Sequence, residues 1–355
     1  MNPTCRQRDA RVRILLTADP EIPVPPRGYG GIERIIDSLV RALRGQEHTV
    51  GLAAHPDSTS PADSLFAWPA RTSANAVDTL RNTVALSSAI RRFQPDVLHS
   101  FSRLAYLLPA LLKRLPKIMS YQRHTGGRQV SFAARLAGRT LRFTGCSEFI
   151  SGQGRKWGGI WNTIPNFVEI DKYDFVPTVP LDAPLVFLSR IESIKGPDLA
   201  IEIAVASGRR LILAGNRAEW GPEREFWDRR IAPHLGQKGI EWVGEVDDVK
   251  KNSLLGSAAA LLLPVQWDEP FGIVFAEAMA TGTPIITCER GALPEIVESG
   301  QTGFFIRNAS EGAAAVARLG DLSRAACRYT VEKRFNVTVC SKQYIRLYRE
   351  LAAKP

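Results

Sequence analysis

The chain of 355 residues is long enough for two domains with separate hydrophobic cores. Its hydrophobic content of 45% is ordinary for a globular protein, and no apolar run reaches the length that spans a bilayer, which excludes a helical membrane protein. The formal net charge of +10 raises the question of nucleic acid, but the sequence contains no recognised nucleic-acid-binding module, so no nucleic-acid partner is expected.

Strand and helix patterns alternate through the first half of the chain. Short apolar runs predict strands, and apolar residues that recur every three to four positions predict helices. The predicted strands are 12–18, 48–54, 96–101, 117–121 and 141–147. The predicted helices are 32–43 and 75–93. Residues 159–183 are rich in proline and aromatic residues and are predicted to form a linker.

A second alternation follows this linker. Its predicted strands are 185–190, 210–215, 240–246 and 260–265. Its predicted helices are 197–207, 222–234, 248–257, one that begins near 271, and a last one at 336–353. Two successive alternations predict an α/β protein with two doubly wound, Rossmann-like domains. Because ligands of such sheets bind at the carboxyl ends of the strands, the cleft between the domains is the expected site.

The predicted domains differ in charge. We expect an N-terminal domain at 1–178, a second domain at 179–335 and a C-terminal helix at 336–355. The first holds 24 Lys and Arg against 14 Asp and Glu, a difference of +10, and the rest of the chain holds 22 against 22. Residues 97–147 contain no acid, and their basic residues are Arg103, Lys113, Arg114, Lys117, Arg123, Arg128, Arg135, Arg139 and Arg142. This stretch suits an anionic lipid or an acidic acceptor, and a solvated basic surface is the alternative.

The ends of the chain and its cysteines bear on location. The first residues, MNPTCRQRDARVR, are polar and basic and lack the apolar core of a signal peptide. The cysteines are odd in number and show no CxxC spacing, so we expect reduced thiols in a cytosolic protein: Cys5, Cys146, Cys288, Cys327 and Cys340. The five histidines form no metal-ligand pattern, and no metal site is expected.

Residues 261–286, LLLPVQWDEPFGIVFAEAMATGTPII, form the most informative segment. A short apolar strand precedes Glu269, seven residues separate Glu269 from Glu277, and a Gly-Thr-Pro turn leads into another strand. Pro270 is expected in the first turn of the intervening helix, where a missing N–H costs nothing.

Backbone donors are expected between the two carboxylates. The amides of Phe271, Gly272 and Ile273 would be unpaired at the positive end of the helix dipole, where phosphate or hydroxyl oxygens bind. Two acceptors flanking these donors suit a ligand that carries both hydroxyls and phosphates.

This layout resembles the E-x7-E segment of the retaining glycosyltransferases of family 4, in particular the bacterial phosphatidylinositol mannosyltransferase type. The likeness includes the preceding strand, the Pro-Phe-Gly and the Ala-Met-Ala-Thr-Gly-Thr-Pro that follows Glu277. A glutamate pair alone would indicate only a surface carboxylate and a helix cap. The resemblance covers most of residues 12–350. It implies the GT-B architecture, with a nucleotide-sugar-binding second domain, an acceptor-binding first domain and a C-terminal helix that packs back on the first domain.

The resemblance also implies catalytic roles. The segment LSRIESIKG puts Arg190 and Lys195 on the family's Arg-x4-Lys-Gly pair, which neutralises the departing diphosphate. Glu269 would bind sugar hydroxyls, and Glu277 would accept from both ribose hydroxyls. The resemblance further implies attack on the same face of the sugar, with the leaving phosphate accepting the proton of the acceptor hydroxyl.

Further donor contacts follow from the same resemblance. Gly30 and Gly31, in PPRGYGGIER, match the family's Gly-Gly loop beside the donor sugar and phosphates. Gly215 ends the strand RLILAG, while Val246 by its backbone and Lys251 by its side chain match positions that hold the base. A glycine-rich turn for tight packing is the structural alternative for Gly30 and Gly31, and a solvated basic turn is the alternative for Arg190 and Lys195.

Histidines and acids near the predicted strand ends have competing interpretations. His124 matches a family histidine at the reacting sugar, and a purely structural histidine is the alternative. His99 is expected mainly to pack. Asp247-Asp248 does not indicate a metal site, because Asp248 is expected to cap a helix. The run Asn166-Phe167-Val168-Glu169 departs from the family's Asn-Gly-Val-Asp, which puts the linker geometry in doubt.

Together these features predict a retaining, metal-independent glycosyltransferase that uses a nucleoside-diphosphate sugar, UDP or GDP, and needs no other cofactor. The acceptor is expected to be a hydroxyl of a glycolipid or cell-envelope saccharide, reached at the inner face of the membrane through the basic first domain. A catalytically silent nucleotide-sugar-binding subunit is the alternative. A phosphorylase-like enzyme would need a lysine in a pyridoxal-phosphate context, and an epimerase would not explain Arg-x4-Lys-Gly together with E-x7-E.

Overall fold

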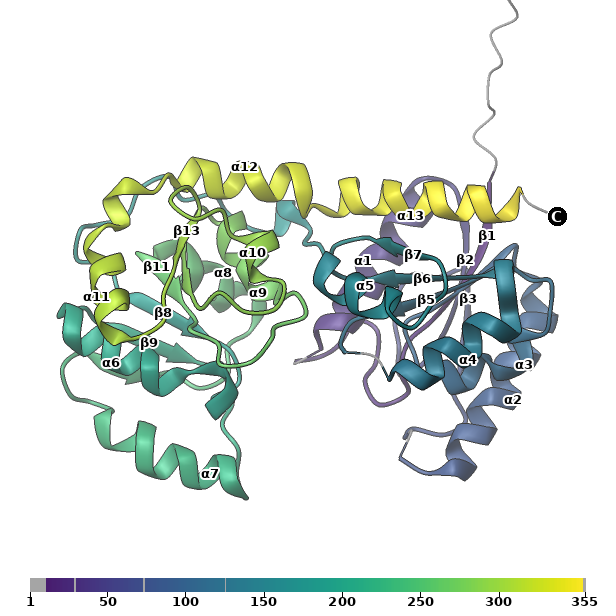
Figure 1. Cartoon of the computed structure of the whole chain (residues 1–355), viewed down its shortest axis with the longest axis horizontal. Coiled ribbons are helices and arrows are strands. Elements are labelled where there is room, and N and C mark those ends of the chain that lie inside the picture. The colour runs from purple at the N-terminus through teal and green to yellow at the C-terminus, as the bar shows by residue number, and fades with distance from the viewer. Residues whose placement is uncertain (1–10, 29, 73, 125, 354–355) are drawn as a thin grey trace, which may run out of the picture. The chain divides into compact units, whose positions relative to one another are not determined.

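The computed structural model of the protein describes residues 11–353 apart from positions 29, 73 and 125. By its contacts the chain divides into two compact units (Figure 1). Unit 1 holds Met1–Pro165 and Val337–Pro355, and unit 2 holds Asn166–Asn336. The division predicted from the sequence lay at 178/179, whereas residues 166–178 group with unit 2.

Unit 1 is built on a seven-stranded sheet in the order β3-β2-β1-β4-β5-β6-β7, in which every neighbouring pair is parallel. Its strands are β1 Arg13–Thr17, β2 Thr49–Ala54, β3 Ser64–Ala67, β4 Val97–Ser100, β5 Lys117–Tyr121, β6 Leu141–Gly145 and β7 Trp161–Thr163. The five strands predicted in this half are confirmed. The edge strands β3 and β7 were not predicted, and β7 lies inside the predicted linker.

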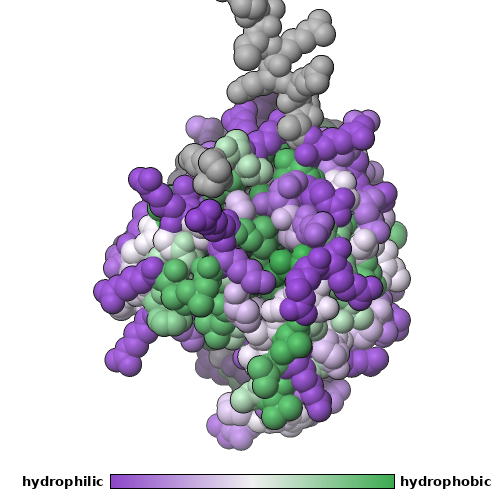
Figure 2. Space-filling view, turned by 90° about the vertical axis from the view of Figure 1, so that its right-hand side faces the viewer, coloured by the Kyte–Doolittle hydropathy of each residue, from purple (hydrophilic) through white to green (hydrophobic). Residues whose placement is uncertain are grey.

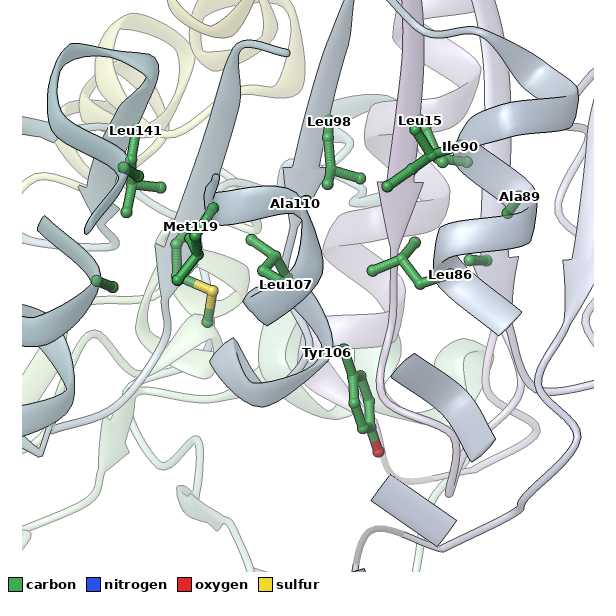
Figure 3. Close-up of a cluster of buried hydrophobic side chains, with 14 of the residues drawn as sticks. Leu15, Leu86, Ala89, Ile90, Leu98, Tyr106, Leu107, Ala110, Met119 and Leu141 are labelled. Atoms are coloured by element: carbon green, nitrogen blue, oxygen red, sulfur yellow. The ribbon is translucent and has the colours of Figure 1, made fainter. Parts of the chain in front are cut away.

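Helices α2, α3 and α4 cover one face of this sheet. The helices of unit 1 are α1 Gly31–Gly45, α2 Ala76–Phe93, α3 Leu108–Leu111, α4 Gly127–Ala137, α5 Glu148–Arg155 and α13 Val337–Ala352. Leu15, Leu98 and Met119, from three adjacent strands, point into one buried cluster with Leu86 and Ile90 of α2 (Figure 3). Burying each such side chain contributes about 1.5–3 kcal/mol to stability, so this cluster anchors the helical layer.

Helix α13 belongs to unit 1, as the family resemblance implied, and packs against α1. His99 of β4 points to the face opposite Leu98, because side chains alternate along a strand. Its ring is 5.0 Å from the ring of Tyr344 and 5.7 Å from that of Tyr348, both on α13. His99 therefore has the expected packing role, because its ring packs against this last helix.

Unit 2 has a six-stranded parallel sheet in the order β10-β9-β8-β11-β12-β13. Its strands are β8 Leu185–Leu188, β9 Leu211–Ala214, β10 Ile240–Trp242, β11 Ala260–Leu262, β12 Ile285–Thr287 and β13 Gly303–Phe305. Its helices are α6 Pro197–Ser207, α7 Pro222–Phe226, α8 Asp248–Ser257, α9 Ile273–Ala280, α10 Leu293–Ile296, α11 Ala309–Ala317 and α12 Arg324–Arg334.

One predicted helix of unit 2 is broken. Residues 222–234 were predicted as one helix, but α7 gives way to a π-helical turn at Trp227–Ile231 and a 3-10 turn at Ala232–His234. Pro233 lies in the last turn, and proline has no N–H to continue an α-helical ladder.

Exposed apolar side chains occur on α2, α3 and α4 of unit 1. Leu80 of α2 is 64% exposed, Leu112 after α3 is 74% exposed, and Phe132 of α4 is 56% exposed. Figure 2 shows such apolar surface interrupted by strongly hydrophilic side chains. In the part of the chain that the structure describes, no helix is long and apolar enough to cross a membrane.

Candidate active site

The segment with the two glutamates runs from β11 through a loop into α9. The helix begins at Ile273, and Gly272 before it has left-handed backbone (φ 76°, ψ 81°). The prediction that Pro270 lies in the first helical turn is therefore wrong, because Pro270 and Phe271 belong to the loop. The amide of Phe275 already donates to the Gly272 carbonyl oxygen at 3.1 Å, so the amides of Phe271, Gly272 and Ile273 remain the predicted donors at this end of α9.

Two glycines fix the position of the Glu269 loop. A Cβ at Gly272 would come within 2.5 Å of the Phe275 ring and 3.1 Å of the Glu269 side chain. A Cβ at Gly291 would lie 2.4 Å from the Glu269 carbonyl oxygen, which also accepts a 2.8 Å hydrogen bond from the amide of Ala292. Any larger residue at either position would displace the carboxylate.

Lys195 and Glu269 form a buried ion pair. The Lys195 Nζ lies 2.7 Å from Glu269 Oε2, and the two side chains are 11% and 10% exposed. Trp267 Nε1 donates a 2.9 Å hydrogen bond to the same oxygen, and the Lys195 ammonium lies 4.6 Å from the Trp267 ring centre. Both hydrogen bonds end on Oε2, so Oε1 is the oxygen through which Glu269 can accept from a ligand hydroxyl.

This ion pair joins two predicted motifs, since Lys195 ends the 3-10 turn Ser193–Lys195 after β8 and Glu269 follows β11. Strands β8 and β11 are adjacent in the sheet, so their carboxyl ends bring the motifs together. Trp267 was not predicted. Its indole contacts both Glu269 and Lys195. The only sequence signal for this role was its position two residues before Glu269.

Glu277 lies at the centre of a second charged group. The Lys251 Nζ is 2.6 Å from Glu277 Oε1 and 3.1 Å from Asp248 Oδ1. The Tyr173 hydroxyl donates a 2.7 Å hydrogen bond to the same Oε1 of Glu277. Burial acts to lower the pKa of Lys251, but Glu277 and Asp248 outweigh it and raise that pKa, so the ammonium stays charged. Tyr173 lies in the predicted linker and was missed for that reason.

The cap of α8 differs from the prediction. Asp247 is the N-cap, because its side chain accepts a 2.8 Å hydrogen bond from the amide of Lys250. Asp248 is the first residue of the helix, and its carboxylate faces Lys251 instead. Among the residues with described positions, no three His, Cys, Asp or Glu side chains gather as a metal site would require.

The remaining predicted donor residues also lie at strand ends of unit 2. Arg190 follows β8 and pairs with Glu192 at 2.5 Å, with its side chain 39% exposed. Gly215 follows β9, and a Cβ there would lie 1.9 Å from the carbonyl oxygen of Ser189, so glycine lets the ends of two strands approach. Val246 lies half-buried in the loop between β10 and α8.

Gly30, Gly31 and His124 lie in unit 1. Helix α1 begins at Gly31 with Gly30 as its cap, and a Cβ at Gly30 would meet Pro26 at 2.7 Å. His124 follows β5 and is exposed, with Nδ1 2.8 Å from Gln153 Oε1.

His124 lines a cavity of about 550 Å³ at the carboxyl ends of β1, β4 and β5, which we call the unit 1 cavity. Asp19 and Arg123 also line it, with 4.0 Å between Asp19 Oδ2 and the guanidinium. Burial, helped by Glu21, raises the pKa of Asp19 to about 6 against the opposing effect of nearby arginines. Asp19 Oδ1 and Gln122 Oε1 are buried acceptors without a hydrogen-bond partner in the described structure, so this cavity offers oxygens to a ligand with O–H or N–H groups.

Comparison with known protein families identifies both units. Residues 29–172 match the model described as Glycosyltransferase Family 4, and residues 172–325 match the model described as Glycosyl transferases group 1. Both halves of the chain thus match glycosyltransferase families. The change from one model to the other at residue 172 lies within seven residues of the boundary between the units, 172 − 165 = 7.

Curated relatives of this glycosyltransferase match it over part of their lengths. Glycogen synthase of Mycobacterium tuberculosis is 32% identical over 147 residues, which are 39% of this chain and 34% of that protein. The phosphatidyl-myo-inositol mannosyltransferase of Mycobacterium leprae is 27% identical over 225 residues, 57% of this chain and 58% of that protein. The chain thus matches less than two thirds of either relative.

Solved structures of glycosyltransferases match nearly the whole fold. AviGT4, a glycosyltransferase involved in avilamycin A biosynthesis, is 25% identical with a TM-score of 0.73, over 97% of this chain and 99% of that one. Anabaena HepE in complex with UDP-glucose is 18% identical with a TM-score of 0.71, over 96% of this chain and 100% of that one. The predicted GT-B architecture, with two Rossmann-like α/β units, is confirmed.

Proposed function

We propose that this protein transfers a sugar from a nucleoside-diphosphate sugar to a hydroxyl acceptor with retention of configuration at the anomeric carbon. The observation that carries the proposal is the pair of buried ion pairs in unit 2, Lys195 with Glu269 and Lys251 with Glu277. Each carboxylate of the E-x7-E segment is bonded to a lysine through one oxygen, which leaves its second oxygen for a ligand hydroxyl.

In this proposal the donor binds along the carboxyl edge of the unit 2 sheet. The two ribose hydroxyls donate to Glu277, and the base lies near Val246 and Lys251. The amides of Phe271, Gly272 and Ile273 hold phosphate and sugar oxygens, and the cations Arg190 and Lys195 neutralise the diphosphate. Glu269 accepts from a sugar hydroxyl through Oε1 and orients the anomeric carbon.

The proposed reaction breaks the bond from the anomeric carbon to the diphosphate oxygen and forms a bond from that carbon to the acceptor oxygen on the same face. The leaving diphosphate gains negative charge as its bond breaks, so Lys195 and Arg190 stabilise the transition state more than the bound donor. The same diphosphate takes the proton of the acceptor hydroxyl. Because these cations neutralise the charge, the proposal includes metal independence, and transfer should persist in excess EDTA.

The acceptor is proposed to bind in the unit 1 cavity. Asp19 and Gln122 offer unpartnered oxygens to acceptor hydroxyls, while Arg103 and Arg123 suit a phosphate on the same molecule. A phosphorylated or lipid-linked polyol fits this combination. The mannosyltransferase among the relatives supports a phosphoinositide-like acceptor, and the basic unit 1 would then work at an anionic membrane surface.

A thermal-shift panel of UDP-, GDP- and ADP-sugars tests the donor half of the proposal. A bound donor raises the melting temperature by mass action, so one nucleotide series should stabilise the protein and lose its effect in Glu277→Gln. Slow hydrolysis of that donor without acceptor should also be measurable. Stabilisation without any hydrolysis or transfer would favour the silent-subunit alternative, and no stabilisation by any nucleotide sugar would refute the proposal.

A further inference from the structure

A second cavity of unit 1 lies at the amino-terminal edge of its sheet. It measures about 750 Å³ and is lined by Arg114, Pro116, Arg139, Thr140, Arg142, Ile160 and Leu351. All but Leu351 lie just before a strand or at its start, because β5 begins at Lys117, β6 at Leu141 and β7 at Trp161. The unit 1 cavity with Asp19 and His124 lies at the opposite edge of the sheet, and β5 reaches both cavities. The five residues of β5 separate the two by roughly 15 Å, since a strand rises about 3.3 Å per residue.

The charged groups of this amino-edge cavity are all positive. Within residues 11–353, the described positions provide no carboxylate partner for Arg114, Arg139 or Arg142. Arg142 is only 8% exposed, and its one described hydrogen bond goes to the carbonyl oxygen of Arg139 at 2.9 Å. A guanidinium has five N–H donors, so most of the donors of this buried cation are available to a ligand.

A fourth cation lies behind the wall of the cavity. Lys117 is fully buried, and its Nζ donates to the carbonyl oxygen of Lys113 at 3.0 Å and to Thr140 Oγ1 at 2.7 Å. Burial lowers the pKa of Lys117 to about 8, so the ammonium is still charged at neutral pH. These carbonyl and hydroxyl oxygens accept hydrogen bonds from Lys117, but they carry no negative charge to balance the ammonium. Burying positive charge without a counter-ion is costly, and an anion in the cavity would offset that cost.

We propose that the amino-edge cavity is a phosphate-binding site, distinct from the donor and acceptor sites. The three guanidinium groups offer the multidentate donors that phosphate oxygens prefer. The volume exceeds what a lone phosphate needs, and Ile160 and Leu351 add apolar wall, so the ligand is a phosphate ester with further atoms attached. This assignment does not depend on the proposed transferase activity.

Two sources supply such a phosphate, a lipid headgroup or a soluble phosphate ester. Helices α3 and α4 pack against each other and end beside the cavity, at Leu111 before Arg114 and at Ala137 before Arg139. Leu112, directly after α3, is 74% exposed, and Phe132 of α4 is 56% exposed. Apolar side chains beside a basic cavity would also contact the acyl chains of an anionic lipid. Binding to anionic vesicles therefore distinguishes the lipid headgroup from the soluble ester.

The test compares two double variants with equal loss of charge. Arg114→Gln/Arg139→Gln removes the two exposed arginines of the cavity, and the control Arg71→Gln/Arg91→Gln removes two exposed arginines elsewhere on unit 1. Binding is measured by flotation with phosphatidylglycerol or phosphatidylcholine vesicles, and by thermal shift with glycerol 3-phosphate. If each arginine contributes about one charge-assisted hydrogen bond, the cavity variant should bind its ligand on the order of 100-fold more weakly, and the control less than threefold.

Each outcome is informative. Loss of vesicle binding in the cavity variant alone assigns the site to a lipid headgroup. Loss of glycerol 3-phosphate stabilisation in that variant alone assigns it to a soluble ester. Equal losses in both variants would mean that general surface charge attracts the anion, which overturns the proposal, as would no binding by the wild-type protein to either probe. Donor hydrolysis should be unchanged in both variants, so a failure of this site is distinguishable from a failure of the transferase proposal.

Discussion

At the scale of single residues, the unit 2 site depends on charges that are buried in pairs. Lys195 and Glu269 are each about nine-tenths buried, and Trp267 contacts both. Removing one member of such a pair leaves the other buried and uncompensated, which typically costs about 3–5 kcal/mol. Variants of this site therefore change stability and activity together unless the partner is changed as well.

We expect Lys195→Ala to reduce sugar transfer by roughly 1,000-fold or more, because one of the two cations that stabilise the departing diphosphate is lost. The double variant Lys195→Ala/Glu269→Gln should recover most of the lost stability but not the activity. Transfer rates and urea unfolding of both variants separate the two effects, with the exposed Lys250→Ala as a control. Near-wild-type turnover in Lys195→Ala would remove its proposed role.

Replacing Asp19 should raise the stability of the protein and lower its activity. Its folded pKa of about 6 lies above the ordinary 3.8, so its stabilising contribution is present at low pH and is lost as the pH rises through 6. Asp19→Asn should therefore raise the free energy of unfolding at pH 7.5 by about 1–3 kcal/mol and weaken acceptor use. The exposed Asp57→Asn is the matched control for urea unfolding and for the acceptor KM. A destabilised or fully active Asp19→Asn would contradict the prediction.

At the scale of elements, buried strands were predictable and side-chain partners were not. The strands β1, β2, β4, β5 and β6 are almost continuously buried, because parallel strands are covered on both faces, and each contains apolar residues that marked it in the sequence. The edge strand β3 is half exposed and β7 has only three residues, so neither produces a clear pattern. The carboxylates and lysines of the site were recognisable from local spacing. Tyr173 was not, because 104 residues separate it from Glu277.

Helix α13 covers a buried row of hydrogen-bonded polar side chains. Its Tyr348 hydroxyl lies 2.6 Å from His99 Nδ1, and Ser120 Oγ lies 2.6 Å from His99 Nε2. Ser120 also lines the unit 1 cavity, so α13 is linked to the proposed acceptor site through His99. Burial lowers the pKa of His99 to about 3, so the ring is neutral in the folded protein.

The buried His99 should make the stability of unit 1 decrease as the pH falls. The unfolded state takes up a proton near pH 6.5 and the folded state does not, so stability is full above 6.5 and falls as the pH drops toward 3. Between pH 7 and pH 5 the loss from His99 should be about 2 kcal/mol. His99→Asn should show a correspondingly smaller drop in urea-unfolding free energy between these pH values, and exposed His234→Asn should behave as wild type. Equal drops in all three proteins would contradict the assignment.

At the scale of the whole molecule, the two units have separate sheets and separate cores, and both buried ion pairs of the proposed donor site lie in unit 2. We therefore expect residues 166–336, produced alone, to fold cooperatively and to bind the same nucleotide as the full chain within about tenfold in affinity. Thermal shift and circular dichroism would measure this, with Glu277→Gln in the same segment as the control. A segment that is unfolded, or folded without nucleotide binding, would show that unit 2 depends on unit 1.

Because α13 follows unit 2 in the chain and packs in unit 1, the order of synthesis on the ribosome differs from the order of the units. The part of unit 1 up to Pro165 is made first, but the sheet face at His99 lacks its covering helix until Tyr348 has been translated, 183 residues later (348 − 165 = 183). Unit 2 emerges whole in between and can fold while unit 1 is incomplete. Premature termination near residue 336 would thus release a chain whose nucleotide-binding half is finished and whose other half still exposes an apolar face to chaperones and proteases.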